Sequence, residues 1–261
     1  MDWFYGLPAA LSLPLFVGSF VILSLVVLLA LRPLVRRLAG DREEWDRVLG
    51  YAIASFGLFY GILLALVAVS VYTNFTTVQQ DVLNETSLLA SLYRDVSGFP
   101  HDQAVPMQDD LRQYVHLVIT RDWPLQRMDI PPNDGTSAIS SFQTHLLALE
   151  PRSAGDQALL GQTIQEFDEF VAARRARIAD AEIALPALLW GVLWTGAVIN
   201  AVMLALIQVK RLTIHIVMAG LLALYVGLLI YEIASMDHPY SGSIAIEPTD
   251  FELVLKQVMG G

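Results

Sequence analysis

Four long apolar segments without charged side chains dominate this sequence. One of them, Val48–Tyr72, runs for twenty-five residues without a charge, and the others are Leu11–Leu31, Ile183–Val209 and Leu212–Tyr231. A helix rises about 1.5 Å per residue and the hydrocarbon core of a bilayer is about 30 Å thick, so each segment is long enough to cross it. The sequence therefore predicts an all-α membrane protein with four transmembrane helices and a helical extramembrane insertion between spans two and three.

The predicted spans divide the chain into four parts. Residues 1–72 hold transmembrane helices 1 and 2 with a basic cytoplasmic loop, and residues 73–182 form an acidic helical extracytoplasmic domain. Residues 183–234 hold transmembrane helices 3 and 4, and residues 235–261 form an extracytoplasmic C-terminal tail. Since the first ten residues carry no Lys or Arg, Leu11–Leu31 is interpreted as a retained span and not as a cleaved signal peptide.

The amino-acid composition excludes several kinds of site. Hydrophobic residues make up 55% of the chain and charged residues only 16%, against about a quarter in a typical soluble domain. The chain has no cysteine, which excludes disulfides, cysteine-ligated zinc and cysteine nucleophiles. No phosphate-binding glycine loop, metalloprotease motif or histidine pair at metal-ligand spacing occurs. We therefore expect no enzymatic activity, no cofactor, no metal ion and no nucleic-acid partner.

Basic residues beside the spans predict the orientation, because short loops rich in Lys and Arg stay in the cytoplasm. The first short loop holds Arg32, Arg36, Arg37, Arg42 and Arg47, and the turn between spans three and four holds Lys210 and Arg211. A basic cluster before span three (Arg174, Arg175 and Arg177) argues for the opposite orientation, but large domains translocate with little regard to charge. We expect a plasma (inner) membrane protein with both termini and residues 73–182 extracytoplasmic.

The insertion is acidic and carries helical periodicity. Residues 73–182 hold 8 basic and 16 acidic residues, so most of the chain's net charge of −10 lies there. Apolar residues recur at helical spacing from Val78 to Val96, which predicts that span two continues outward as one long helix. A similar stripe from Leu160 to Ile178 leads into span three, which predicts that both outer helices of the insertion are continuous with membrane spans. Shorter helices are predicted at 107–120 and 138–149.

Span two carries candidates for packing and for a pore. Gly50, Gly57 and Gly61 follow helical spacing, and small residues let membrane helices approach closely, either within one chain or between subunits. Pore-lining candidates on the same span are Ser55, Phe56, Tyr60 and Ser70. An apolar ring can gate a pore by dewetting. Alternatively, the two aromatic residues face lipid or a neighbouring helix.

Polar residues in or near the last two spans are the other candidates. Glu232, Asp237 and His238 lie at the end of span four, where they could bind an ion or sense pH, or could form part of a turn. Asn200 lies in the middle of span three, where a polar group is costly and needs a partner or a water-filled path. An interhelical hydrogen bond and a transport role are both open for Asn200.

Short motifs spread along nearly the whole chain resemble those of one family. They are Ser55-Phe-Gly-Leu-Phe-Tyr-Gly61, Val78-Gln-Gln-Asp-Val-Leu-Asn-Glu-Thr86, Leu92-Tyr-Arg-Asp95, Arg121-Asp-Trp-Pro124, Ala172-Ala-Arg-Arg175 and Met236-Asp-His-Pro-Tyr-Ser-Gly242. In order and spacing they resemble the bestrophin-like domain family of bacterial membrane proteins, which is distantly similar to bestrophins. Bestrophins are pentameric anion channels whose second span lines the pore through an apolar neck.

The resemblance implies a homo-oligomeric ion channel in the lipid bilayer, a pentamer by analogy, with inorganic ions as its substrates. Ion selectivity stays undetermined, because the acidic insertion would concentrate cations near its mouth. A hypothesis from another class is a non-conducting membrane sensor or scaffold whose extracytoplasmic helical domain binds a ligand or partner. Ion flux through the purified protein distinguishes the two.

Overall fold

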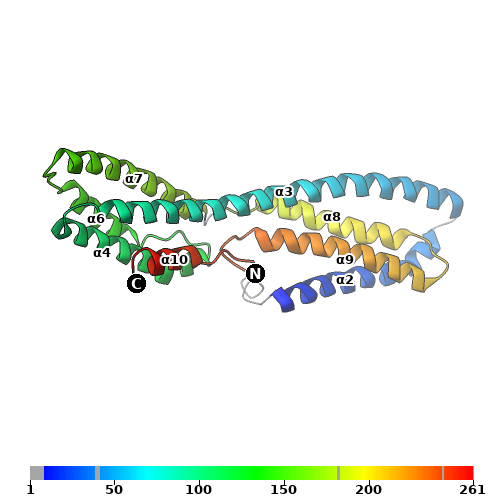
Figure 1. Cartoon of the computed structure of the whole chain (residues 1–261). Helices are drawn as coiled ribbons and strands as arrows, with labels where there is room; N and C mark the ends of the chain where they lie inside the picture. The colour runs from blue at the N-terminus through cyan, green and yellow to red at the C-terminus, as the bar shows by residue number, and fades with distance from the viewer. Residues whose placement is uncertain (1–8, 39–41, 181–182, 243, 261) are drawn as a thin grey trace. The chain divides into compact units, whose positions relative to one another are not determined.

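The computed structural model describes residues 9–38, 42–180, 183–242 and 244–260. The chain divides into two compact units (Figure 1). Unit 1 comprises Met1–Thr73, Ala184–Asp237 and Gly242–Ile244, and unit 2 comprises Asn74–Ile183, His238–Ser241 and Ala245–Gly261. The described residues form helices and their connections without any strand, as the all-α prediction requires.

Unit 1 is built from four helices that are each long and apolar enough to cross a membrane. They are α2 (Ala9–Leu38), the first part of α3 (Arg42–Val96), α8 (Ala187–Leu206) and α9 (Leu212–Met236). The helix α2 packs against α8 and α9. One face of α3 joins the same core through Tyr60, Leu64, Val67 and Val71. The four apolar helices predicted from the charge-free segments are confirmed.

The helix α3 is continuous over 55 residues and contributes to both units (Figure 1). No proline occurs between Pro33 and Pro100, so nothing in this stretch removes a backbone donor. Beyond Thr73 the buried face of α3 carries Val78 and Val82, which belong to the core of unit 2. The prediction that span two continues as one long helix is therefore confirmed.

Unit 2 surrounds the second part of α3 with shorter helices. These are α4 (His101–Leu117), the π-helix η1 (Val118–Asp122), α5 (Trp123–Gln126), α6 (Thr136–Leu147), α7 (Ala154–Ala179) and α10 (Thr249–Gln257). The helix α4 packs against α6, and α10 packs against α4 and η1. Residues 245–260, which the sequence suggested as a tail, thus belong to the core of this unit through Phe251 and Met259.

The connection between α7 and α8 differs from the prediction. The apolar stripe suggested that the last helix of the insertion runs into span three, but α7 ends at Ala179 and α8 begins at Ala187. Pro186 occupies the N-cap of α8 with φ −53° and ψ 137°. A proline disfavours helical backbone for the residue before it and cannot donate a helical hydrogen bond, so the prediction of a continuous helix was wrong here.

Candidate functional site

Tyr60, a pore-lining candidate, is buried inside unit 1. Its hydroxyl donates a hydrogen bond of 2.9 Å to the carbonyl oxygen of Leu193 on α8. Its ring lies directly over Gly196, where an added Cβ would come within 2.2 Å of the ring. Phe56 stacks on Tyr60 with ring centroids 5.5 Å apart. The structure therefore gives Tyr60 a packing role between α3 and α8, the alternative that the sequence left open.

The remaining candidates on α3 have different surroundings. Ser55 and Ser70 are exposed in the single chain. At Gly50, Gly57 and Gly61, no described atom of another segment lies within 4 Å of the place that a Cβ would take. These glycines therefore make no close helix contact with the described part of their own chain. The close approach is made instead at Gly196, which sequence reasoning missed although its neighbours Gly191 and Thr195 show the same small-residue spacing.

A groove opens beside the contact between Tyr60 and Gly196. It has a volume of about 620 Å³ and is lined by apolar residues of α3 and α8, among them Phe59, Leu63 and Val192. Apart from Thr195, its lining carries only apolar side chains and the Tyr60 ring. The groove can therefore contact hydrocarbon or another apolar surface, and its lining provides no polar binding site.

Asp237 organises the start of α8 in unit 1. Its Oδ1 accepts a hydrogen bond of 2.6 Å from the backbone N–H of Leu185, and its Oδ2 accepts one of 2.9 Å from Trp190 Nε1. Asp237 is buried, so both of its oxygens satisfy donors that would otherwise lack a partner near the N-terminus of this helix. This geometry assigns Asp237 a structural role.

The other polar candidates do not join Asp237 in one site. His238 Nδ1 lies 3.0 Å from Asp129 Oδ2 within unit 2. Glu232 is exposed and Asn200 is half-buried. Within the described ranges, no three His, Cys, Asp or Glu side chains come together in a way that could hold a metal ion.

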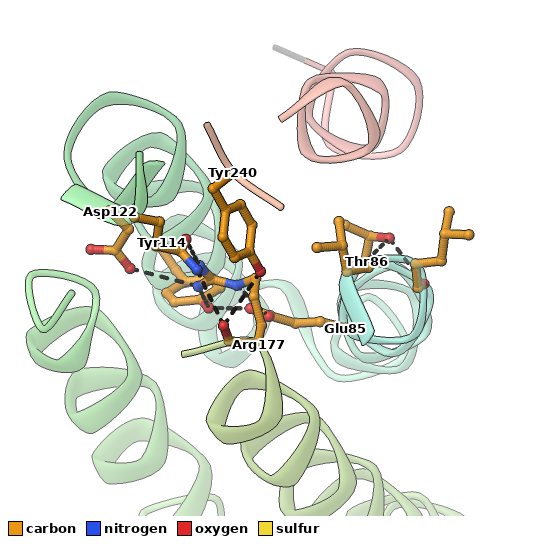
Figure 2. A network of polar contacts seen from close by, with 9 residues as sticks. Glu85, Thr86, Tyr114, Asp122, Arg177 and Tyr240 are labelled. Carbon is orange, nitrogen blue, oxygen red and sulfur yellow. Dashed lines mark hydrogen bonds and ion pairs between the residues drawn. The ribbon is translucent and has the colours of Figure 1, made fainter. Parts of the chain in front are cut away.

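The most elaborate polar arrangement lies in the core of unit 2, around Arg177 (Figure 2). Arg177 is fully buried, and its Nε donates a hydrogen bond of 2.6 Å to Glu85 Oε2 on α3. Its Nη1 donates to Gln126 Oε1, and its Nη2 lies 3.6 Å from Asp122 Oδ2. Tyr114 on α4 donates its hydroxyl proton to the other oxygen of Glu85. Arg177 Nη2 also donates to the Tyr114 hydroxyl at 3.3 Å, so one guanidinium contacts side chains from four other elements.

Burial and neighbouring charges shift the pKa values of the residues in this network. Burial, the largest single effect, lowers the pKa of Arg177. The charge of Glu85, the hydrogen bond to it, and Tyr114 and Tyr240 together raise the pKa by more, so it lies above its usual range and the guanidinium stays charged. Burial, and then the negative charge of Glu85, raise the pKa of Tyr114, so this hydroxyl remains a neutral donor. Burial also raises the pKa of Asp122, against the opposing effect of Arg177. The buried guanidinium of Arg177 therefore keeps its charge beside the Glu85 carboxylate, which suits a structural clamp.

The network collects residues from motifs that are far apart in the sequence. Glu85 comes from the motif 78–86, Asp122 from 121–124, and Tyr240, whose hydroxyl donates to the carbonyl oxygen of Arg177 at 3.4 Å, from 236–242. Arg177 lies two residues after the motif 172–175. Sequence reasoning counted Arg177 only as a basic residue near span three. The signal that could have found it is the presence of charged residues on otherwise apolar stripes of α3 and α7.

Comparison with known proteins agrees with this architecture. The chain matches the family model of the Bestrophin-like domain over residues 18–251. A crystal structure of a bacterial bestrophin homologue from Klebsiella pneumoniae superposes with a TM-score of 0.67, at 11% sequence identity, over 94% of this chain and 99% of that one. A search of curated protein sequences finds no match. The likeness to the solved structure shows a shared fold.

Proposed function

Because the chain belongs to the Bestrophin-like domain family, we propose that it forms a homo-oligomeric ion channel in the plasma (inner) membrane. The observation that carries this proposal is the match over residues 18–251 together with a fold shared over 94% of the chain with a bacterial bestrophin homologue. The four apolar helices of unit 1 supply the membrane-spanning part. Five subunits are proposed by analogy, and the ion is left open.

The helix α3 is the proposed lining of the ion path. Its buried face is occupied by the packing of Tyr60, Leu64 and Val71 within unit 1. The opposite face is free of charge and exposed, with Leu58 at 61%, Ile62 at 50% and Val69 at 63% of full exposure. If several subunits surround one symmetry axis, this face of each α3 would together form apolar rings around the ion path. Such rings control permeation because ions pass only when water fills them. The open space at the three glycines leaves room for a neighbouring subunit beside this face.

Single cysteines provide the test, because the chain has none of its own. We expect a charged, water-soluble thiol reagent to block most of the ion flux into liposomes for Ser55→Cys, Ile62→Cys or Ser70→Cys, three exposed positions of α3. A thiol reacts as the thiolate, which forms in water and not in lipid, so only a position on a water-filled path is modified quickly. Stopped-flow flux with and without reagent is the measurement.

Leu221→Cys is the matched control, since Leu221 is an exposed residue of α9 at 62%. Its flux should not respond to the reagent. Block at the control and at none of the three α3 positions would remove α3 from the path. No flux of any common ion through an intact oligomer would favour the alternative function, a membrane sensor or scaffold whose helical domain binds a ligand or partner.

We further propose that residues 73–182 and both termini are extracytoplasmic, on the strength of the basic loops. Arg174 and Arg177, from the cluster that argues for the opposite orientation, are buried in unit 2 and contact Thr136 and Glu85. These arginines thus have a structural reason to be present that is unrelated to topology.

Labelling in intact cells tests the orientation. Gln143 on α6 and Lys210 between α8 and α9 are both exposed. We expect an impermeant thiol reagent to label Gln143→Cys from outside and to label Lys210→Cys only after the membrane is opened. The reverse pattern would place unit 2 in the cytoplasm.

A further inference from the structure

Two exposed apolar side chains lie close together in a turn of unit 2, residues 127–130. Met128 and Ile130 are 59% and 45% exposed, and only Asp129 separates them in the chain. The other large apolar side chains that are exposed in the described part of unit 2 occur singly, at Leu83, Leu147, Ile183 and Leu253. Single exposed apolar residues are common on protein surfaces, whereas neighbouring ones form a patch that a partner can cover.

Specific hydrogen bonds fix the backbone of this turn. The N–H of Ile130 donates to the carbonyl oxygen of Leu125 at 3.0 Å, and the N–H of Asp129 donates to the carbonyl oxygen of Gln126 at 3.0 Å. This pair of bonds is the Schellman pattern, which ends a helix with one residue in the left-handed conformation, and Asp129 has φ 57°. The exposure of Met128 and Ile130 is therefore a property of an ordered turn.

Asp129 connects the turn to the segment that follows α9. A left-handed position favours glycine, but the carboxylate at this position has a partner, since Asp129 Oδ2 lies 3.0 Å from His238 Nδ1. The Ser241 hydroxyl donates a hydrogen bond to the carbonyl oxygen of Arg127 and makes a second connection. His238 comes two residues after Met236, the last residue of α9, so their Cα atoms are at most about 8 Å apart. The covalent chain therefore keeps the turn close to the end of α9.

This end of α9 reaches the boundary of the bilayer. Its 25 residues span about 37 Å, which exceeds a hydrocarbon core of about 30 Å. The segment Leu212–Tyr231 carries no Asp, Glu, Lys or Arg, and Glu232 after it is exposed. The headgroup layer adds about 5–8 Å on each side of the core. The last turn of α9 and His238 after it thus lie beside the headgroup layer of a membrane that α9 crosses.

The charges around the two apolar side chains are compensated within unit 2. Arg127 forms an ion pair with Glu247, and Asp129 forms one with His238 when the imidazole is protonated. Paired charges cost less to bring out of water than single ones. The turn therefore offers two apolar side chains without an excess of charge, which suits the hydrocarbon of lipids.

We propose that Met128 and Ile130 anchor unit 2 to the lipid surface beside the end of α9. The two side chains enter the boundary between headgroups and acyl chains, while the Asp129 carboxylate stays with His238. Interfacial anchors bind more strongly the more apolar area they bury. The anchor rests on α9 as a membrane span and not on ion conduction.

Spin labels at single cysteines test the anchor in liposomes, because the chain has no cysteine of its own. Oxygen concentrates in hydrocarbon and a water-soluble nickel chelate does not, so their relative collision rates in electron paramagnetic resonance report whether a label lies in lipid or in water. For Met128→Cys and for Ile130→Cys, we expect oxygen collisions to exceed those of the chelate.

Ala158→Cys is the matched control, because Ala158 is exposed on α7 and lies about 32 Å along this helix from its end at Ala179. The chelate should dominate there. Adding Ile130→Asp to Met128→Cys should move the label toward water, because a charge is costly in the acyl region. Both positions are exposed, so neither change disturbs the core.

Three outcomes would overturn the anchor. A chelate that dominates at both positions would place the turn in water. Spectral broadening that disappears when labelled subunits are diluted with unlabelled ones would show that a second copy of the chain covers the turn. A label at Met128→Cys that ignores Ile130→Asp would show that apolar contact does not hold the turn in place. Each of these results is independent of the flux test.

Discussion

Replacing Arg177 by methionine should destabilise unit 2 by about 3–5 kcal/mol, the largest effect that we expect from a single substitution. The guanidinium is fully buried and pairs with Glu85 at 2.6 Å and with Asp122 at 3.6 Å. Without it Glu85 stays buried without its ion-pair partner and Asp122 keeps only the weaker influence of Arg174. Removing one partner of a buried ion pair is costly for this reason. Since a folded domain is stable by only about 5–15 kcal/mol, such a loss should show as poor yield and early unfolding.

Thermal unfolding in detergent, followed together with proteolysis of unit 2, is the measurement. Arg175→Met is the matched control, because Arg175 is exposed on the same helix. The double variant Arg177→Met with Glu85→Gln should lose less stability than the sum of the two single variants, since residues of one network are not additive. Equal stability of Arg177→Met and Arg175→Met would show that the network is not a clamp.

Gly196→Ala should weaken the packing of α3 against α8 by about 1–3 kcal/mol, the usual effect of overpacking. The new Cβ would lie 2.2 Å from Tyr60 Cε2 and 2.5 Å from Cδ2. The ring cannot simply swing aside, because the Tyr60 hydroxyl is bonded to Leu193 O on the same helix. Either the hydrogen bond or the distance between the two helices must change.

Gly191→Ala is the matched control, since an added Cβ there meets no described atom within 4 Å. Unfolding of unit 1 in mixed micelles of increasing denaturing detergent measures the difference between the two variants. In a Tyr60→Leu background the substitution Gly196→Ala should have little further effect, because the clashing ring is gone. If Gly196→Ala tolerates as much denaturing detergent as Gly191→Ala, the close contact between α3 and α8 does not limit stability.

The success of the sequence predictions depended on whether a feature is local. Membrane-length apolar helices follow from the number of consecutive uncharged residues, and the continuity of α3 follows from the absence of proline. The same reasoning failed between α7 and α8, where the apolar stripe was given more weight than Pro186. A helical stripe indicates which face of a helix is buried but not where the helix stops.

The sequence did not indicate which residues contact one another in the folded chain. Nothing local to Gly196 distinguishes it from Gly191, yet only Gly196 lies under the ring of Tyr60. Likewise the basic cluster before span three looked like a single surface feature, whereas Arg177 is fully buried and Arg175 is exposed. Which of several equivalent residues is buried depends on the neighbouring element, which helical periodicity does not specify.

By itself, the sequence determined that this protein has four apolar helices, a long second helix and an acidic helical insertion, because hydrophobic length and net charge are sums over neighbouring residues. Only the tertiary structure decided that Glu85, Tyr114, Asp122 and Arg177 share one buried network. The free-energy cost of an ionised side chain depends more on its burial than on the residues beside it in the sequence. The chemistry of unit 2 therefore depends on which charges the fold brings together.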